Sequence, residues 1–204
     1  MVIGLTGGIA SGKSLVTRYL NELDIPVIDT DEIARQIVAP DQPAWQSIYD
    51  IFGPAVFLPD RELDRAALAR IVFHDPDARR RLEAVTHPAI FAEVDRQIGF
   101  IQNQSPAPEL IFVAVPLLFE VNAERHFTAT VLIATSREHQ CTRLMQTRGY
   151  TQEEAEARID AQLPLSEKIA RADYVLYNNG TPRQLRKRVL GLVRHLRMLA
   201  TPKG

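Results

Sequence analysis

The sequence predicts a three-layer α/β fold built on a five-stranded parallel sheet. Short apolar runs rich in β-forming residues are bounded by polar or turn residues, which is typical of strands buried on both faces of a parallel sheet. Amphipathic helical patterns lie between these runs, and such alternation indicates a layered fold. The expected strands are residues 2–5, 25–28, 110–115, 130–134 and 174–177.

The expected elements divide into a core and two long connections. Residues 30–109 separate the second and third strands, and residues 136–171 separate the fourth and fifth; both are too long for simple crossovers. The first contains helical stretches at 65–73 and 76–85, and the second predicts two charged helices around Gly149. We interpret residues 30–85 as a helical substrate subdomain, 136–171 as a lid, and approximately 1–29, 86–135 and 172–204 as the core of a single domain. Core helices are expected at 14–23, 89–101 and 183–199.

The composition is that of a globular protein. Of its 204 residues, 46% are hydrophobic and 24% charged, which excludes a disordered chain. The 24 basic and 25 acidic residues nearly cancel, so no overall field favours nucleic acid or an anionic membrane. We expect neither as a partner, and we expect a monomer or a weak homo-oligomer.

The cysteine and histidine content limits which disulfides and metal sites the protein can form. Cys141 is the only cysteine, and the five histidines lack metal-ligand spacing. We therefore expect no disulfide and no structural zinc. We also expect no haem and no flavin. Met1 leads directly into an apolar strand and a glycine-rich turn, without the basic segment and long apolar stretch of a signal peptide. We expect a cytoplasmic protein.

The most informative segment runs from Gly7 to Ser14, Gly-Gly-Ile-Ala-Ser-Gly-Lys-Ser, and matches the phosphate-binding pattern G-x-x-x-x-G-K-[ST] between a strand and a helix. Glycines let the backbone curl so that N–H groups point at phosphate oxygens, and the helix N-terminus adds its positive end. Lys13 can reach the β- and γ-phosphates, and the Ser14 hydroxyl can ligate Mg²⁺. The pattern predicts a P-loop NTPase fold that binds ATP through Gly8, Ile9, Ala10, Ser11, Gly12, Lys13, Ser14 and Leu15. The alternative is a tight turn with an incidental lysine and serine.

Two carboxylates follow the second strand, in Asp29-Thr30-Asp31. Carboxyl ends of parallel strands form the ligand-binding edge of open α/β sheets. One carboxylate could accept the proton of an attacking hydroxyl, and the other could hold magnesium through water. In the alternative, Thr30 or Asp31 only caps a helix running to Val38.

Two other classes of protein compete with a kinase. A regulatory GTPase is disfavoured because the guanine-reading Asn-Lys-x-Asp pattern is absent, and the D-x-x-G match at residues 50–53 follows no buried strand. A nucleic-acid-binding module is supported only by basic residues in the last helix, which are more often the solvated face of an amphipathic helix.

Five ordered motifs resemble those of the dephospho-coenzyme A kinase family and span nearly the whole chain. They are Thr6 to Ser14; Asp29, Asp31 and Arg35; His87, Pro88 and Ile90; Pro116 to Glu120; and Ala157 to Gln162 with Ala172 to Gly180. The resemblance implies that the ribose 3′-hydroxyl of dephospho-coenzyme A attacks the γ-phosphorus of ATP, giving coenzyme A and ADP in the last step of coenzyme A biosynthesis. The alternative is another P-loop kinase of a small molecule, nucleoside or nucleotide.

The resemblance also implies residue roles. Asp31 is expected to be the general base. The other expected catalytic residues come from the sequence itself: Lys13 from the phosphate-loop pattern, and Arg143 from the lid candidate, because a guanidinium suits phosphate. Arg35, His87, Leu117, Phe119 and Glu120 are expected to bind the acceptor with Asp31, and Arg158 and Asn178 to bind ATP. Arg148 lies one place after the position where relatives carry a basic residue, here Thr147, which leaves its role open.

Plainer structural roles remain open for these residues. His87-Pro88 could only start a helix at Ala89, Leu117 to Phe119 could be core residues, and Glu120 could pair with an arginine. The lid arginines could form ordinary helix-surface ion pairs.

Overall fold

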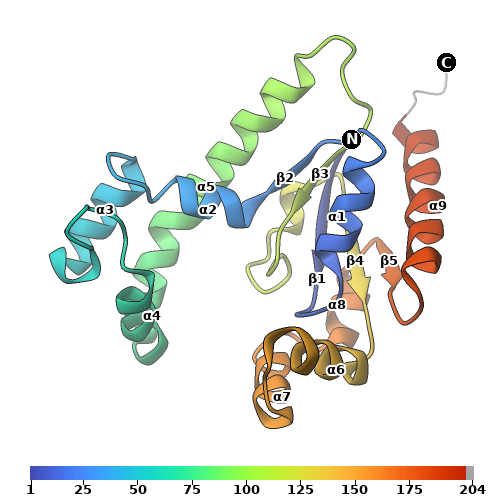
Figure 1. Cartoon of the computed structure of the whole chain (residues 1–204). Coiled ribbons are helices and arrows are strands. Elements are labelled where there is room, and N and C mark those ends of the chain that lie inside the picture. Colours follow the sequence, from blue (N-terminus) through green and yellow to red (C-terminus); the bar gives the residue numbers. More distant parts are fainter. Residues whose placement is uncertain (201–204) are drawn as a thin grey trace. The chain divides into compact units, whose positions relative to one another are not determined.

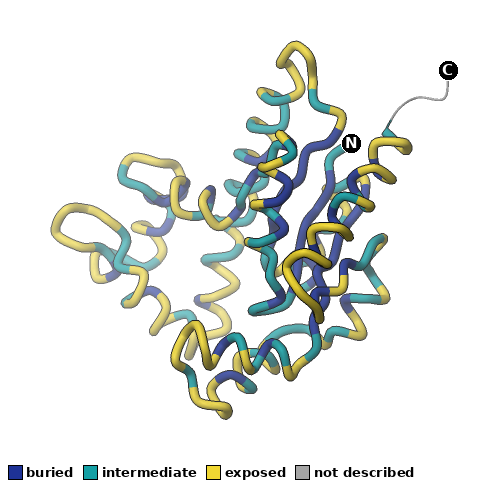
Figure 2. Tube along the Cα trace, turned by 45° about the vertical axis from the view of Figure 1, so that its right-hand side comes forward, coloured by how far each residue is buried: buried dark blue, intermediate teal, exposed yellow. Residues whose placement is uncertain are grey.

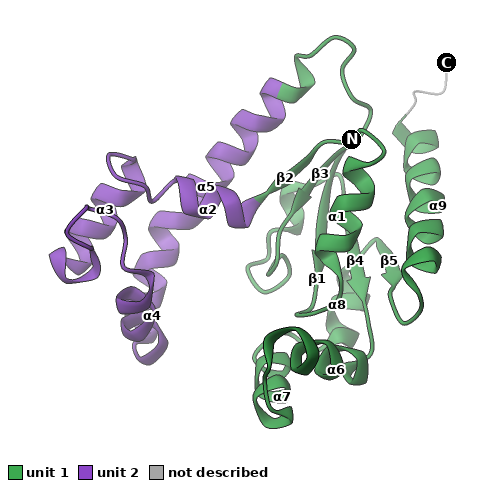
Figure 3. Ribbon diagram, in the orientation of Figure 1, with its two compact units in different colours: residues 1–29, 101–204 green, residues 30–100 purple. Residues whose placement is uncertain are grey.

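The computed structural model of the protein describes residues 1–200. The chain forms two compact units (Figure 3), one made of residues 1–29 and residue 101 onward, the other of residues 30–100. Across residues 1–200, no helix is both long and apolar enough to cross a membrane.

The first unit contains the predicted five-stranded parallel sheet (Figure 1). Its strands are β1 (Val2–Gly7), β2 (Val27–Asp29), β3 (Ile111–Ala114), β4 (Ala129–Ala134) and β5 (Tyr174–Tyr177). Their spatial order is β2-β3-β1-β4-β5, so β1 is central and its carboxyl end lies where the strand order reverses. Ligands of open α/β sheets bind at this kind of position.

Two helices cover one face of the sheet: α1 (Lys13–Asn21) and α9 (Pro182–Ala200). Leu185, Val189, Val193 and Leu196 of α9 are buried in one cluster with residues of α1 and the strands, as their spacing along one helix face predicts. Figure 2 shows the strands as the buried layer. The chain after β3, which includes the short 3-10 helix η2 (Glu124–His126), covers the opposite face. A Cβ at Gly4 would lie 2.6 Å from the Phe127 ring, so a side chain at position 4 would clash with this ring.

The second long connection forms three helices, not the two that the sequence predicted. They are α6 (Arg137–Arg148), α7 (Gln152–Asp160) and α8 (Leu165–Arg171). The first two lie around Gly149 as expected: Gly149 ends α6 with a left-handed φ of 68°, and Thr151 and Glu154 form a capping box that starts α7. The third was missed because its 7 residues, about two turns, include too few apolar residues to show a period.

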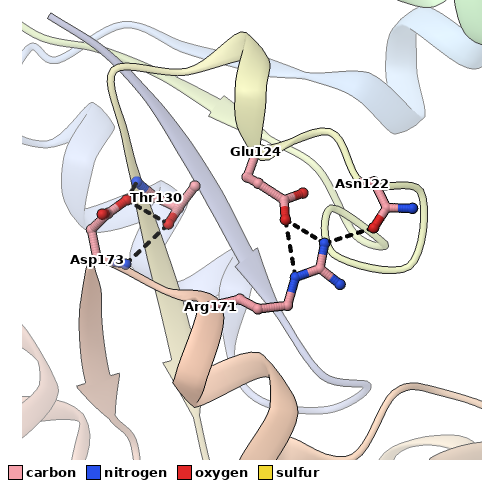
Figure 4. A network of polar contacts seen from close by, with 5 residues as sticks. All are labelled: Asn122, Glu124, Thr130, Arg171 and Asp173. Atoms are coloured by element: carbon pink, nitrogen blue, oxygen red, sulfur yellow. Dashed lines mark hydrogen bonds and ion pairs between the residues drawn. The ribbon is translucent and has the colours of Figure 1, made fainter.

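Strands β4 and β5 are locked together at their start by Asp173 (Figure 4). Its carboxylate accepts hydrogen bonds from the backbone N–H of Thr130 at 2.8 Å and from the Thr130 hydroxyl at 2.9 Å. The same hydroxyl accepts from the Asp173 N–H. These reciprocal bonds fix the register of the edge strand β5, and Asn178 is the residue directly after this strand.

The second unit is helical. It consists of α2 (Thr30–Gln36), α3 (Pro43–Phe52), the short 3-10 helix η1 (Pro54–Val56), α4 (Arg65–His74) and most of α5 (Pro76–Gln102). An aromatic cluster joins α3 to η1: the rings of Trp45 and Phe57 are 4.8 Å apart, and the Trp45 indole donates to the Arg61 carbonyl at 2.7 Å.

The expectation of a helix beginning near Pro88 was wrong, because α5 continues through this proline for 27 residues. Proline lacks the N–H that an interior helical position needs, so the pattern suggested a boundary. The continuous helix places His87 within α5, not at a helix start.

Candidate active site

The phosphate-binding loop connects the end of β1 at Gly7 to the start of α1 at Lys13. Gly12 has a φ of 98°, a left-handed conformation that favours glycine. A Cβ here would lie 2.3 Å from Nδ2 of Asn178. The loop closes on itself through a bond of 3.0 Å from the Ser11 N–H to the Gly8 carbonyl.

Side chains from distant elements bind the carbonyls of this loop. Gln140 donates to the Ile9 carbonyl at 2.7 Å. Arg143 donates to the carbonyls of Ala10 and Ser11 at 3.0 and 3.2 Å, and Asn178 donates to that of Ser11 at 2.7 Å. These side chains hold the loop carbonyls, while the N–H groups of Ile9 and Ser11 donate to Gln162 and to the Gly8 carbonyl. The remaining loop N–H groups are the ones that a phosphate nest would use.

Arg143 is the centre of this support. Its Nη2 also donates to the Asn178 carbonyl at 2.9 Å, so one guanidinium ties α6, the phosphate loop and the end of β5 together. Burial lowers the pKa of Arg143, but an arginine remains charged in proteins. The structure therefore brings the predicted residues Arg143 and Asn178 to the predicted loop.

The loop forms one wall of a cavity of about 320 Å³. Gly8, Ser11 and Gln140 line it, together with residues of the α7–α8 region that include Gln162 and Lys168. Gln162 accepts a hydrogen bond of 2.9 Å from the Ile9 N–H. The cavity therefore lies beside the phosphate loop at Gly8 and Ser11, and the Ile9 N–H already has a partner in Gln162.

The cavity wall also contains an ion pair between α6 and α7. Arg137 donates to both carboxylate oxygens of Asp160, at 2.5 and 2.9 Å. This hydrogen bonding lowers the pKa of Asp160 and raises that of Arg137. Asp160 is therefore ionised and paired near neutral pH. On the same pair of helices, the predicted ATP-binding residue Arg158 lies over the Tyr150 ring at 4.3 Å from its centroid.

The predicted acceptor residues fall in both units. In the first, Leu117 is 43% exposed, whereas Phe119 is 1% exposed and lies under the Arg171 guanidinium. Glu120 accepts from the Leu163 N–H at 3.3 Å and pairs with Lys168. Acceptor binding by these three residues stays a prediction.

In the second unit, Asp31 and Arg35 lie one turn apart on α2, and both are exposed. Such spacing puts two side chains on the same helix face. His87 is half-buried in α5. The roles of these residues, like those of Lys13 and Ser14 at the start of α1, stay predictions.

Sequence reasoning missed Gln140, Gln162 and Lys168. Gln162 closes a motif that the sequence analysis quoted, but no local signal connects a glutamine or lysine in a charged helical segment to a loop more than a hundred residues earlier. Their contacts arise from tertiary packing.

Comparison with known proteins agrees with this geometry. The model of the dephospho-CoA kinase family matches residues 1–184. A dephospho-CoA kinase from Geobacter metallireducens is 45% identical over 192 residues, covering 94% of each chain. The structure of TT1252 from Thermus thermophilus aligns with a TM-score of 0.82 at 35% identity, covering 96% of this chain and 97% of that one. The dephospho-CoA kinase from Campylobacter jejuni aligns with a TM-score of 0.73 at 28% identity, covering 98% of each. This chain therefore belongs to the dephospho-CoA kinase family.

Proposed function

We propose that this protein transfers the γ-phosphoryl group of ATP to the ribose 3′-hydroxyl of dephospho-coenzyme A, giving coenzyme A and ADP. The observation that supports this most directly is the supported phosphate loop, whose carbonyls from Ile9 to Ser11 are bound by Gln140, Arg143 and Asn178, in a chain that the family model matches over residues 1–184.

Phosphoryl transfer depends mainly on positioning and on positive charge around the transferred group. Lys13, the first residue of α1, is assigned to the β- and γ-phosphates, and the loop N–H groups to the remaining phosphate oxygens. Arg143 keeps the loop in the conformation that presents those groups. Arg158 is assigned to the nucleotide, where a guanidinium suits phosphate oxygens.

The acceptor hydroxyl needs a base that accepts its proton during attack. Asp31 is assigned this role, because its carboxylate lies on the exposed side of α2, directly after the strand that ends at Asp29. Arg35, one turn away, is assigned to the anionic acceptor. By the family resemblance, His87, Leu117, Phe119 and Glu120 are each assigned to acceptor binding.

Magnesium is part of the proposal. Mg²⁺ takes few protein ligands, prefers oxygen and relies on substrate phosphates, and the exposed Ser14 hydroxyl in the first turn of α1 fits this chemistry. When bound with ATP, the ion supplies positive charge to the β- and γ-phosphates. A cytoplasmic location also belongs to the proposal, since a chain whose only cysteine is Cys141 forms no internal disulfide and suits a reducing compartment.

The test is ADP release from MgATP with and without dephospho-coenzyme A, with adenosine and AMP as control acceptors. We expect strong stimulation by dephospho-coenzyme A alone and formation of coenzyme A in an amount equal to ADP. Stimulation by a different acceptor, and none by dephospho-coenzyme A, would overturn the substrate assignment while keeping the kinase reaction.

A further inference from the structure

One ionisable group in the cavity beside the phosphate loop has no part in the mechanism above. Lys168 of α8 is 2% exposed, although lysine is among the residues least often buried. It lines the cavity together with Gly8 and Ser11 of the phosphate loop. Its Nζ lies 2.5 Å from Oε1 of Glu120.

The ammonium group has unused hydrogen-bonding capacity. It carries three N–H donors. Within residues 1–200 its ionic partner is Glu120, and Nζ of Lys168 forms no further hydrogen bond. The Ser11 hydroxyl, on the loop side of the same cavity, is also buried and has no hydrogen-bond partner in the described chain. Buried polar groups without partners are costly. Oε2 of Glu120 is a third such atom, but Glu120 does not line the cavity, whereas Lys168 and Ser11 do, so the groups on the cavity side favour an anionic ligand.

The charges on the cavity wall point the same way. The charged residues among its lining are Lys168, Arg137 and Asp160, and Asp160 has both oxygens bound by Arg137. Glu120 is not among the lining residues, so the carboxylate that holds Lys168 lies behind the wall. The ammonium is covered by protein atoms, and a charge surrounded by protein acts on a nearby phosphate more strongly than one in water.

We propose that Lys168 is a further residue of the nucleotide site, a buried cation, held in place by Glu120, that supplies positive charge to the phosphates of ATP in the cavity. This inference rests on the proposed kinase function. It also gives Glu120 a task different from acceptor binding, that of fixing Lys168.

The competing explanation is a purely mechanical one, in which the ion pair only attaches α8 to the chain after β3. The structure already provides that attachment through Arg171, one turn further along α8 (Figure 4). Arg171 pairs with Glu124, donates to Asn122 at 2.8 Å, and lies over the Phe119 ring. Arg171 does not line the cavity, so the Arg171–Glu124 pair is a matched control for the Lys168–Glu120 pair.

The experiment compares wild type with two neutralised pairs, Lys168→Met/Glu120→Gln and Arg171→Met/Glu124→Gln. Replacing both partners leaves no buried charge unpaired, so both proteins should fold. The dissociation constants of ATP, ADP and AMP are measured by calorimetry with Mg²⁺ and without acceptor, and thermal unfolding is recorded in parallel.

If Lys168 acts on the phosphates, its pair variant should lose about ten- to a hundredfold in ATP affinity, less in ADP affinity and about twofold or less in AMP affinity. The control variant should stay within about twofold of wild type for all three nucleotides. ATP affinity equal to that of the control variant, or an equal loss for ATP, ADP and AMP, would show that Lys168 is only an attachment. Because the assay contains no acceptor, its outcome is independent of whether dephospho-coenzyme A is the substrate.

Discussion

Gly12→Ala tests whether the phosphate loop depends on the contact between Gly12 and Asn178. The variant places an L-residue at a φ of 98°, which costs about 1–2 kcal/mol. Its Cβ would also lie 2.3 Å from the Asn178 amide nitrogen. Asn178 is 5% exposed and donates to the Ser11 carbonyl. Its displacement leaves a buried amide unpaired, at a further cost of about 1–3 kcal/mol.

Gly149→Ala separates the two effects. Gly149 has a φ of 68°, and a Cβ there meets nothing within 4 Å, so this variant should cost only the backbone strain of about 1–2 kcal/mol. Urea unfolding followed by circular dichroism measures both variants, and calorimetry measures their ATP affinity. We expect Gly12→Ala to be the more destabilised of the two and to be the one that loses ATP affinity.

A double-variant cycle isolates the Asn178 contact. In an Asn178→Ala background the clash is absent, so Gly12→Ala should then cost no more than Gly149→Ala does. The reasoning is refuted if Gly12→Ala costs the same free energy of unfolding in both backgrounds, because the amide contact would then contribute nothing.

The remaining predictions concern individual side chains. Arg143→Met removes the donor to the Ala10, Ser11 and Asn178 carbonyls and should weaken ATP binding about tenfold or more. Arg148→Met, at an exposed position of the same helix, should change ATP affinity by about twofold or less. Equal losses of ATP affinity in the two variants would contradict the role of Arg143 in supporting the loop. Asp31→Asn should lower turnover about a hundredfold or more while ATP affinity, measured by calorimetry, is retained; near-normal turnover would remove Asp31 as the base. Asp173→Ala loses the hydrogen bonds from the N–H and hydroxyl of Thr130. It should lower the free energy of unfolding, measured in urea titrations, by about 2 kcal/mol. A loss below about 0.5 kcal/mol would show that these bonds do not hold β5 in place. Burial disfavours ionisation of Glu124, but the Arg171 hydrogen bond, a backbone hydrogen bond and the charges of Arg171 and Arg125 together outweigh it and lower the pKa of Glu124. A lowered pKa stabilises the fold above the unfolded-state value, and the gain is lost as pH falls through the folded-state value. The stability deficit of Glu124→Gln seen at pH 7 should therefore shrink below about pH 4.5, and a deficit independent of pH would contradict this.

The sequence was sufficient to predict the strands, the parallel sheet and the phosphate loop, because these depend on local patterns. A run such as Leu110–Val115 is apolar on both faces, which favours a buried parallel strand wherever it is placed. The glycines and lysine of residues 7–14 specify a turn and an anion site within a few residues of one another. The ordered motifs then indicated the family that the comparison confirmed.

Tertiary structure alone decided what supports the loop and what fills the cavity wall. Gln140 of α6 and Gln162, between α7 and α8, bind the C=O and the N–H of the same residue, Ile9, and no spacing rule connects positions so distant. Pro88 likewise lies inside the 27-residue α5, whose buried residues are Ala78 and Val94, and the local sequence pattern did not predict this continuation. Lys168 has the sequence context of a solvated helix residue, but folding buries it beside Glu120. The burial of a charge depends on which groups surround it in three dimensions, and the linear sequence does not specify those neighbours.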